Sequence, residues 1–238
     1  KWHLDKPDDV DTWAVGHGFD LAVQEQWSGR FGGRIFSPNR LWVNGDQEFV
    51  PYDYKKYDCK DHFRTNIAFD WLDQRDVKKP FFLFMSYRAP HSFEGPLRDT
   101  LDYKEKDWPE IEKAHAAKIT LLDKQIGRLI NKLKKIYELD NTLILFTSDN
   151  GPHFADGGHE LEFFNSNGKL RGGKRDLYEG GVRVPLIAYW KNKIRPKGKS
   201  YHISGFQDIM ATFAEIIDYK VGENIDGISF LPTLLNKD

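Results

Sequence analysis

The sequence predicts an α/β fold with a mostly parallel sheet. Short apolar runs that suit buried strands alternate along the chain with longer segments of helical periodicity. Strands that alternate with helices favour parallel pairing. Polar clusters follow two of the apolar runs directly, and ligands of open α/β sheets bind beyond the carboxyl ends of their strands.

The composition is that of a folded domain. The chain has 238 residues, 39% of them hydrophobic and 14% aromatic, which is ample for a core. Its 35 basic and 36 acidic residues give a net charge of −1, which argues against a dedicated nucleic-acid binder. We expect no membrane span, because no apolar run approaches the roughly 18 residues needed. The single cysteine, Cys59, excludes an intrachain disulfide and is interpreted as a structural thiol.

The first half of the chain predicts loops, a helix and a strand. Residues 1–57 are rich in Gly, Trp, Asp and Pro, and indicate long loops with short strands. Apolar residues at helical spacing predict a helix over 58–77. The run "PFFLFMSY" (80–87) is almost entirely apolar after its first residue, a proline, and suits a strand buried on both faces.

The second half continues the alternation. A long apolar stripe predicts an amphipathic helix over 109–137. The runs "NTLILFTSD" (141–149) and "VPLIAYW" (184–190) predict buried strands. A further helix is predicted over 203–218.

Two polar clusters occupy the predicted strand ends. In "TSDNGPH", Asp149 and Asn150 are adjacent oxygen donors of the kind that Ca²⁺ or Mg²⁺ prefers, although Asp-Asn-Gly-Pro is also strong turn chemistry. In "SYRAPH", His91 follows the run 80–87, where an imidazole can act as an acid near neutral pH or simply be a surface loop residue.

A glycine-rich basic segment lies over residues 165–185, "NSNGKLRGGKRDLYEGGVRVP". Its glycines allow a close backbone approach to an anion, and Lys169, Arg171, Lys174 and Arg175 supply cations. A solvated basic loop is the alternative interpretation. The spacing matches neither the P-loop nor the dinucleotide fingerprint.

Several sequence motifs, taken together and in their order along the chain, resemble those of a known enzyme family. "KWHL", "GHGFD", "APH", "TSDNGPH", "FFNSNGKLRGGKRDLYEGGVRVPLIAYW" and "DGISFLPTLL" resemble the type I, formylglycine-dependent sulfatases, which are arylsulfatase-like members of the alkaline-phosphatase-like superfamily. The resemblance covers essentially the whole chain. It implies a three-layer α/β/α architecture with a mostly parallel sheet, present in part, and hydrolysis of sulfate monoesters on a sulfated glycan or small molecule.

The resemblance also implies roles for individual residues. Lys1 would contact the sulfate oxygens, and His3 would contact the formylglycine nucleophile. Asp149 and Asn150 would be ligands of Ca²⁺, with Mg²⁺ as the alternative. His91 and Lys174 would lie near the bridging oxygen, where the leaving group is protonated. By their position, four further residues would line the pocket mouth and grip a sugar hydroxyl or second anion: His153, His159, Asn165 and Arg171.

Several family parts have no match here. The formylglycine precursor of the family lies in a Cys-x-Pro-x-Arg context before the Lys-Trp-His motif, whereas Cys59 lies after it and Ser37 in "FSPNR" has the wrong spacing. We therefore expect residues 1–238 to be a partial catalytic domain without the N-terminal nucleophile segment and the C-terminal subdomain, inactive in isolation. The whole protein would need formylglycine-generating maturation machinery and would be exported, to the periplasm, the outside of the cell or a lysosome. Its signal peptide is not in this sequence.

Two other functions stay open. The first is a phosphatase, phosphodiesterase or phosphonate hydrolase of the same superfamily. Those relatives commonly carry Asp-His where this chain has Asp149-Asn150, so Asn150 favours one metal and sulfate. The second is a non-catalytic glycan-binding relative, which would have no need for the whole set of catalytic residues.

Overall fold

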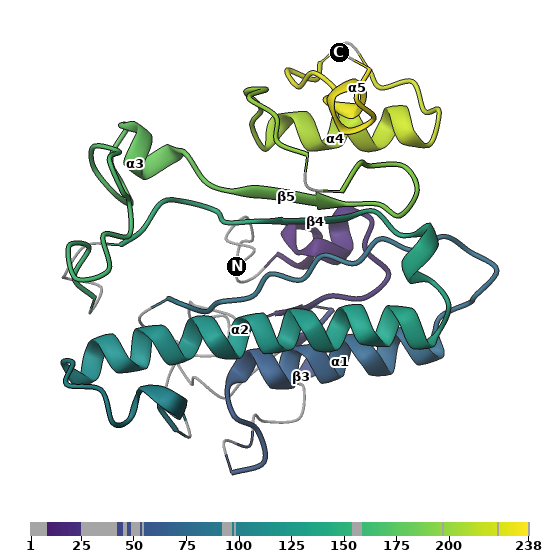
Figure 1. The fold of residues 1–238 in the computed structure, drawn as a ribbon. Coiled ribbons are helices and arrows are strands. Elements are labelled where there is room, and N and C mark those ends of the chain that lie inside the picture. Colours follow the sequence, from purple (N-terminus) through teal and green to yellow (C-terminus); the bar gives the residue numbers. More distant parts are fainter. Residues whose placement is uncertain are drawn as a thin grey trace. The chain divides into compact units, whose positions relative to one another are not determined.

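The structure is a computed structural model of residues 1–238 (Figure 1). It describes residues 9–24, 42–44, 47–48, 53, 55–91, 97, 99–153, 159–196, 198–222 and 224–237. The chain divides into two compact units. Unit 1 comprises Lys1–Leu129 and His153–Ser166, and unit 2 comprises Ile130–Pro152 and Asn167–Asp238.

Two helices form the frame of unit 1. Helix α1 (Lys60–Gln74) buries one face, and Leu72 on that face is 1% exposed. Helix α2 (Glu110–Lys135) has acidic residues in its first turn and lysines in its last, which matches the helix dipole. Its residues up to Leu129 belong to unit 1. Both helices confirm the predicted positions, with ends shifted inward by one to three residues.

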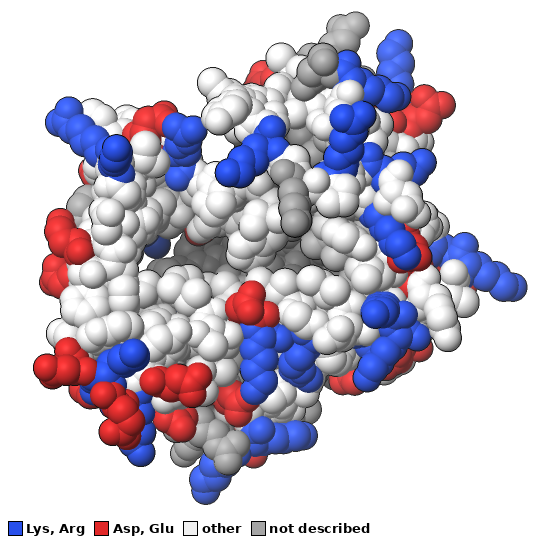
Figure 2. Space-filling view, viewed as in Figure 1, with Lys and Arg blue, Asp and Glu red and all other residues white. Residues whose placement is uncertain are grey.

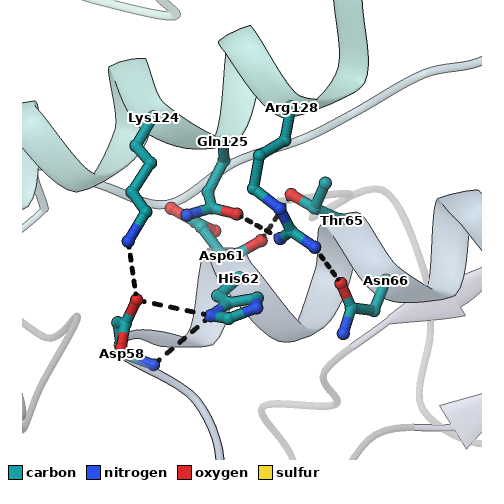
Figure 3. Close-up of polar contacts among 8 residues, drawn as sticks. All are labelled: Asp58, Asp61, His62, Thr65, Asn66, Lys124, Gln125 and Arg128. Atoms are coloured by element: carbon teal, nitrogen blue, oxygen red, sulfur yellow. Dashed lines mark hydrogen bonds and ion pairs between the residues drawn. The ribbon is translucent and has the colours of Figure 1, made fainter. Parts of the chain in front are cut away.

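Polar contacts join α1 to α2 (Figure 3). The Arg128 guanidinium donates to Asn66 Oδ1 at 2.6 Å and to Gln125 Oε1 at 2.7 Å. It also lies 5.0 Å from the ring centroid of Phe69. Lys124 Nζ donates to Asp58 Oδ2 at 3.1 Å at the beginning of α1. These contacts hold the two helices together along much of the length of α1.

Short elements precede α1, as the sequence predicts. They are η1 (Val10–Thr12), η2 (Ala14–His17) and an antiparallel sheet of β1 (Val23–Gln24), β2 (Trp42–Val43) and β3 (Gln47–Glu48). Val23 of β1 packs with Ile67 of α1 against a buried pair of aromatic rings, Tyr57 and Phe63. Cys59, directly before α1, is a buried thiol outside any disulfide, which agrees with its structural interpretation. A short helix, η3 (Leu101–Tyr103), precedes α2.

Unit 2 is built on a two-stranded ribbon. Strand β4 (Ile144–Thr147) follows η4 (Leu139–Asn141) and pairs antiparallel with β5 (Leu186–Tyr189), with Ile144 opposite Tyr189. Both strands lie inside the predicted ranges, but the predicted burial of β5 is wrong, since Leu186, Ile187 and Tyr189 are 40%, 59% and 41% exposed. Helices α3 (Glu179–Val182), α4 (Gln207–Ile216) and α5 (Leu231–Leu234) complete the unit. Helix α4 confirms the predicted helix over 203–218.

The predicted strand over 80–87 is wrong. Residues 80–88 carry no regular secondary structure, and Phe82 and Phe84 are each 57% exposed rather than buried. A strand exists only where a neighbouring backbone completes its ladder, and an apolar run does not supply that partner by itself. The strand pairs of the described residues are antiparallel, so the parallel pairing that the sequence predicts is not among them.

Candidate active site

The turn after β4 presents two oxygen donors. Ser148 Oγ donates to Asn150 O at 3.0 Å, and Asn150 Nδ2 donates to Gly151 O at 2.9 Å. The amide nitrogen of Asn150 is thereby engaged with backbone, and its side-chain oxygen is the atom that could bind a cation. The Asp149 carboxylate is exposed, and no hydrogen bond or ion pair joins it to another described residue. The structure therefore places a turn here, and the oxygen atoms of that turn are accessible.

The glycine-rich segment is fastened to this turn by its backbone. Gly151 N donates to Gly181 O at 2.8 Å, and Lys174 N donates to Pro152 O at 2.7 Å. The approach is close enough that a Cβ atom on Gly151 would lie 1.9 Å from Gly180 O. Glycine is required where two backbones meet this closely. Unit 2 thus brings Lys174 and the Asp149–Asn150 turn into one local structure.

The glycine-rich segment is also ordered internally. Asn167 Nδ2 donates to Leu170 O and to Gly172 O, both at 2.9 Å, and Asp176 Oδ2 accepts from Gly173 N at 3.0 Å. These side chains satisfy backbone groups that would otherwise need water. The segment is therefore a built loop rather than a solvated basic tail.

The basic side chains of this loop differ in their surroundings. The Arg171 guanidinium lies 3.8 Å from the centroid of the Tyr178 ring, which is a cation–π contact. The Lys174 side chain is half-buried, and no hydrogen bond or ion pair of its ammonium is found among the described residues. An ammonium in such a position is available to an anionic ligand, whereas Arg171 is already engaged with an aromatic ring.

His91 lies in unit 1, in a tight turn. Its N–H donates to Arg88 O at 2.8 Å across the cis Ala89–Pro90 peptide. Lys118 Nζ of α2 donates to His91 O at 3.4 Å. The imidazole of His153 is the neighbouring ring, with centroids 6.4 Å apart. Unit 1 therefore brings together two of the predicted site residues, His91 and His153.

His159 is buried in a polar network of unit 1. Its Nδ1 lies 2.6 Å from Glu112 Oε2 and its Nε2 lies 3.1 Å from Ser166 Oγ. The other oxygen of Glu112 accepts from Glu160 N at 2.9 Å. The His159 side chain is 5% exposed and both ring nitrogens are engaged. This geometry holds the segment 159–166 on α2, and the predicted contact of His159 with a sugar stays a prediction.

The ring of His115 stacks on that network. It lies parallel to His159, with centroids 3.7 Å apart and an interplanar angle of 2°. Burial, followed by the neighbouring charge of His159, lowers the pKa of His115 to about 4. His115 is therefore neutral near pH 7 and can lie against a second imidazole without charge repulsion.

An aromatic cluster adjoins the stacked histidines. The ring of Trp108 contacts Phe163 and Phe164 edge to face, with centroids 5.7 and 5.3 Å apart. Asn165 follows these rings with a φ of 50° and an exposed side chain. Its predicted contact with substrate stays a prediction. Lys1 and His3 lie outside the described residues.

Sequence reasoning missed two buried carboxylates of unit 1, Asp61 and Glu112. Both lie among many charged residues at the beginning of a helix, where acids are usually exposed and favoured by the helix dipole. Glu112 occurs four residues before the buried Ala116, on the apolar side of α2, and this spacing is the one signal for its burial. The sequence has no comparable signal for the burial of Asp61.

Charge is spread over the surface that Figure 2 shows. Lysine and arginine side chains occur there together with aspartate and glutamate rather than as one continuous basic field. An anion that binds on that face would therefore be recognised by single lysine or arginine side chains rather than attracted by a large positive surface potential.

Comparison with known proteins identifies the family. A family profile described as Sulfatase matches residues 12–219. The chain belongs to the sulfatase family. An uncharacterised sulfatase, YdeN of Escherichia coli strain K12, is 28% identical to it, and the match covers 100% of this chain and 44% of the relative. Human N-acetylgalactosamine-6-sulfatase is 27% identical, with 99% and 45% covered.

Solved structures agree with this assignment. The crystal structure described as Ps i-CgsB in complex with k-i-k-neocarrahexaose superposes with a TM-score of 0.79 at 25% identity, covering 98% of this chain and 53% of that one. A structure of BT4656 with D-glucosamine-2-N,6-O-disulfate shares the fold, with a TM-score of 0.65 at 22% identity. The fold of this sulfatase chain is accordingly the alkaline-phosphatase-like α/β fold.

The sulfatase chain spans a little under half the length of the curated relatives that it matches over its whole extent. In the part of it that the structure describes, none of the helices combines the length and apolar character needed to cross a bilayer.

Proposed function

We propose that the protein containing this chain hydrolyses sulfate monoesters of carbohydrates. The observation that carries the proposal is that unit 2 joins the turn of Asp149 and Asn150 to the loop of Lys174, whose ammonium has no hydrogen bond or ion pair among the described residues. Hydrogen bonds of 2.7 and 2.8 Å fasten the loop of Lys174 to the turn of Asp149 and Asn150. Membership of the sulfatase family supports the reaction type.

Each proposed role follows from the chemistry of the residue. A sulfate monoester is an anion and repels nucleophiles, so a cation such as Lys174 would bind its oxygens and stabilise the charge that develops in the transition state. The departing alcohol needs a proton, and the His91 imidazole would hold that proton for the bridging oxygen. His153, whose ring neighbours His91, would orient the substrate on the same side.

The donor set of the turn fits a hard cation. A carboxylate and a carbonyl oxygen, from Asp149 and Asn150, are ligands that Ca²⁺ or Mg²⁺ prefers. Since the described residues include no group of three or more His, Cys, Asp or Glu arranged to hold a metal, these two would contribute only part of the coordination sphere. When bound, the cation would supply positive charge to the sulfate oxygens. A formylglycine nucleophile and the contacts of Lys1 and His3 belong to the same proposal.

The substrate class rests on two relatives. The similar solved structure is a complex with k-i-k-neocarrahexaose, and the human relative is named N-acetylgalactosamine-6-sulfatase. A sulfated glycan is therefore the proposed ligand here, with an aryl sulfate as a convenient surrogate. Export of the protein from the cytoplasm is part of the proposal.

The test uses the complete polypeptide with its maturation machinery. Release of inorganic sulfate would be measured from sulfated oligosaccharides and from 4-nitrophenyl sulfate, with 4-nitrophenyl phosphate as the competing substrate. We expect sulfate turnover that is lost on chelation and reduced by about 10²-fold or more in Lys174→Ala, as for other groups that stabilise transition-state charge. Lys169→Ala, in the same loop, is the matched control. Preferred hydrolysis of the phosphate would indicate a phosphatase, and glycan binding without turnover would indicate a binding protein.

A further inference from the structure

A buried carboxylate lies behind the turn that carries His91. Asp61, in the first turn of α1, is 0% exposed. Its Oδ1 accepts from Arg88 N at 3.2 Å and its Oδ2 accepts from Ala89 N at 2.9 Å. One side chain thus holds two consecutive backbone N–H groups, and the second belongs to the residue before the cis proline of the His91 turn.

The charge of Asp61 is balanced at its own helix. The Arg64 guanidinium pairs with Asp61 Oδ1 from one turn further along α1. A buried carboxylate that has a cation and two backbone donors is satisfied and remains fixed, whereas a buried acid without them would be costly. Figure 3 shows Asp61 among the polar side chains of α1 and α2.

A second contact from the same turn of α1 holds the same segment. Thr65 Oγ1 donates to Asp61 O at 2.7 Å and lies 2.9 Å from the Tyr87 hydroxyl. Burial raises the pKa of Tyr87 to about 12, so its phenol stays protonated at any working pH. Residues 87, 88 and 89 are therefore each tied to α1, and His91 follows two residues later.

Helix α2 holds the other end of the turn. Lys118 Nζ donates to His91 O, and Arg128 and Lys124 fasten α2 to α1 through Asn66 and Asp58. The turn of residues 88–91 is thus held from both helices of unit 1, by Asp61 at Arg88 N and Ala89 N and by Lys118 at His91 O. A rigid frame of this kind fixes the direction of a side chain through its backbone.

We propose that Asp61 is a positioning residue for His91: it sets the backbone direction of residues 88–91 and thereby the placement of the His91 imidazole on the bridging oxygen of the substrate. The inference rests on the proposed function of His91 as the proton donor. Asp61 has no contact with substrate in this proposal. The Asp61→Asn change keeps the size of the side chain but turns one acceptor into a donor that faces a backbone N–H.

The kinetic test uses leaving groups of different basicity in the complete enzyme. Protonation by His91 matters most for a poor leaving group such as an alkyl or sugar alkoxide, and least for 4-nitrophenolate. We expect Asp61→Asn to lower kcat/KM for a sugar sulfate by about 10²-fold, as for a misplaced catalytic group, and to change that for 4-nitrophenyl sulfate only a few-fold. An equal loss on both substrates would overturn the proposal, because it would indicate a general structural role.

The matched control is Asp58→Asn. Asp58 lies at the same end of α1 but pairs with Lys124 and His62 instead of with the His91 turn. Any change of kcat/KM in Asp58→Asn should be the same for the sugar sulfate and for 4-nitrophenyl sulfate. Asp61→Glu provides a second variant that keeps the charge beside Arg64 and displaces the oxygens by one methylene. An intermediate effect is expected from it, and a ratio of the two substrates unchanged from the wild type would contradict the proposal.

An NMR measurement separates this inference from the proposed function. The imidazole resonances of His91 would be titrated in wild-type protein, Asp61→Asn and Asp58→Asn. A changed His91 signal and pKa in Asp61→Asn alone supports positioning, even if the wild type hydrolyses no sulfate ester and the proposed function fails. An unchanged His91 titration in folded Asp61→Asn would overturn the positioning role whatever the activity is.

Discussion

Replacing Gly151 with alanine tests whether close backbone contact builds the candidate site. The added Cβ would lie 1.9 Å from Gly180 O, and real Cβ atoms essentially never approach another atom within 3.0 Å. The turn after β4 and the glycine-rich loop must therefore separate. Their separation stretches or breaks two hydrogen bonds, from Gly151 N to Gly181 O and from Lys174 N to Pro152 O.

The magnitude follows from these two effects. Two backbone hydrogen bonds contribute about 1 kcal/mol each, and the forced shift of packed atoms costs about 1–3 kcal/mol more. The free energy of unfolding should fall by about 3–5 kcal/mol in total, which lowers Tm by about 10 °C for a protein of this size. Denaturant unfolding and a thermal scan of the purified protein measure both quantities.

Gly127 supplies the matched control. It lies inside α2, and a Cβ there would meet no atom within 4 Å. Gly127→Ala should raise the free energy of unfolding by about 0.5–1 kcal/mol, because alanine loses less backbone entropy in a helix. The same chemical change is thus expected to have opposite signs at two positions. A Gly151→Ala protein as stable as the wild type would refute the reasoning that this backbone contact holds Lys174 beside the turn.

The other predictions concern single side chains. The pKa of His115 is lowered to about 4 in the folded protein, so the unfolded chain binds a proton at this residue first as pH falls. The free energy of unfolding should therefore decrease between about pH 6.5 and 4. Because the side chain is partly exposed, solvent screening limits this decrease to about 1–2 kcal/mol. Thermal scans of His115→Gln should show a shallower loss over that window, and equal slopes would contradict the assignment. Asp208→Ala should cost about 2 kcal/mol, since its oxygens accept from Gly205 N and Ile228 N at 2.7 and 2.8 Å. The same pair of hydrogen bonds lowers the pKa of Asp208, so the wild type should lose this stabilisation as pH falls below about 4. The Asp208→Ala protein should lack that part of the pH dependence. Asp149→Ala should abolish Ca²⁺ stabilisation of the complete protein in a thermal shift assay, and an unchanged shift would exclude it as a ligand.

Helices were the best predicted elements because their signal is local. The apolar stripe of α2 and its charged ends lie within one continuous stretch, so the observed Glu110–Lys135 differs from the predicted 109–137 by one residue at the start and two at the end. The strand predicted over 80–87 failed for the opposite reason. Its apolar residues indicate a buried segment, but pairing depends on backbone from another part of the chain, and Phe82 and Phe84 are exposed.

The candidate site was predicted in part. From residue types alone, Asp149 and Asn150 favoured a turn over a cation site, and only the order of the motifs favoured the cation site of a sulfatase. The structure shows the turn, with Asn150 Nδ2 donating to Gly151 O, and the cation site stays a prediction. For Arg171, the sequence indicated a free cation, and the ring of Tyr178 is what engages it.

The amino-acid sequence was enough to indicate the three long helices α1, α2 and α4, the positions of β4 and β5 and the family that the chain resembles, because periodicity and motif order are local properties of the chain, whereas the short helices α3 and α5 were not predicted. Tertiary structure alone decided that Asp61, Glu112 and His159 are buried and what they hold. Asp61 accepts a hydrogen bond from Arg88 N, 27 positions away in sequence, and Glu112 contacts His159 and Glu160, 47 and 48 positions away. Burial and pairing of a charged group depend on atoms from such distant positions. The residue type alone therefore does not distinguish a buried, hydrogen-bonded aspartate such as Asp61 from one that is exposed to water.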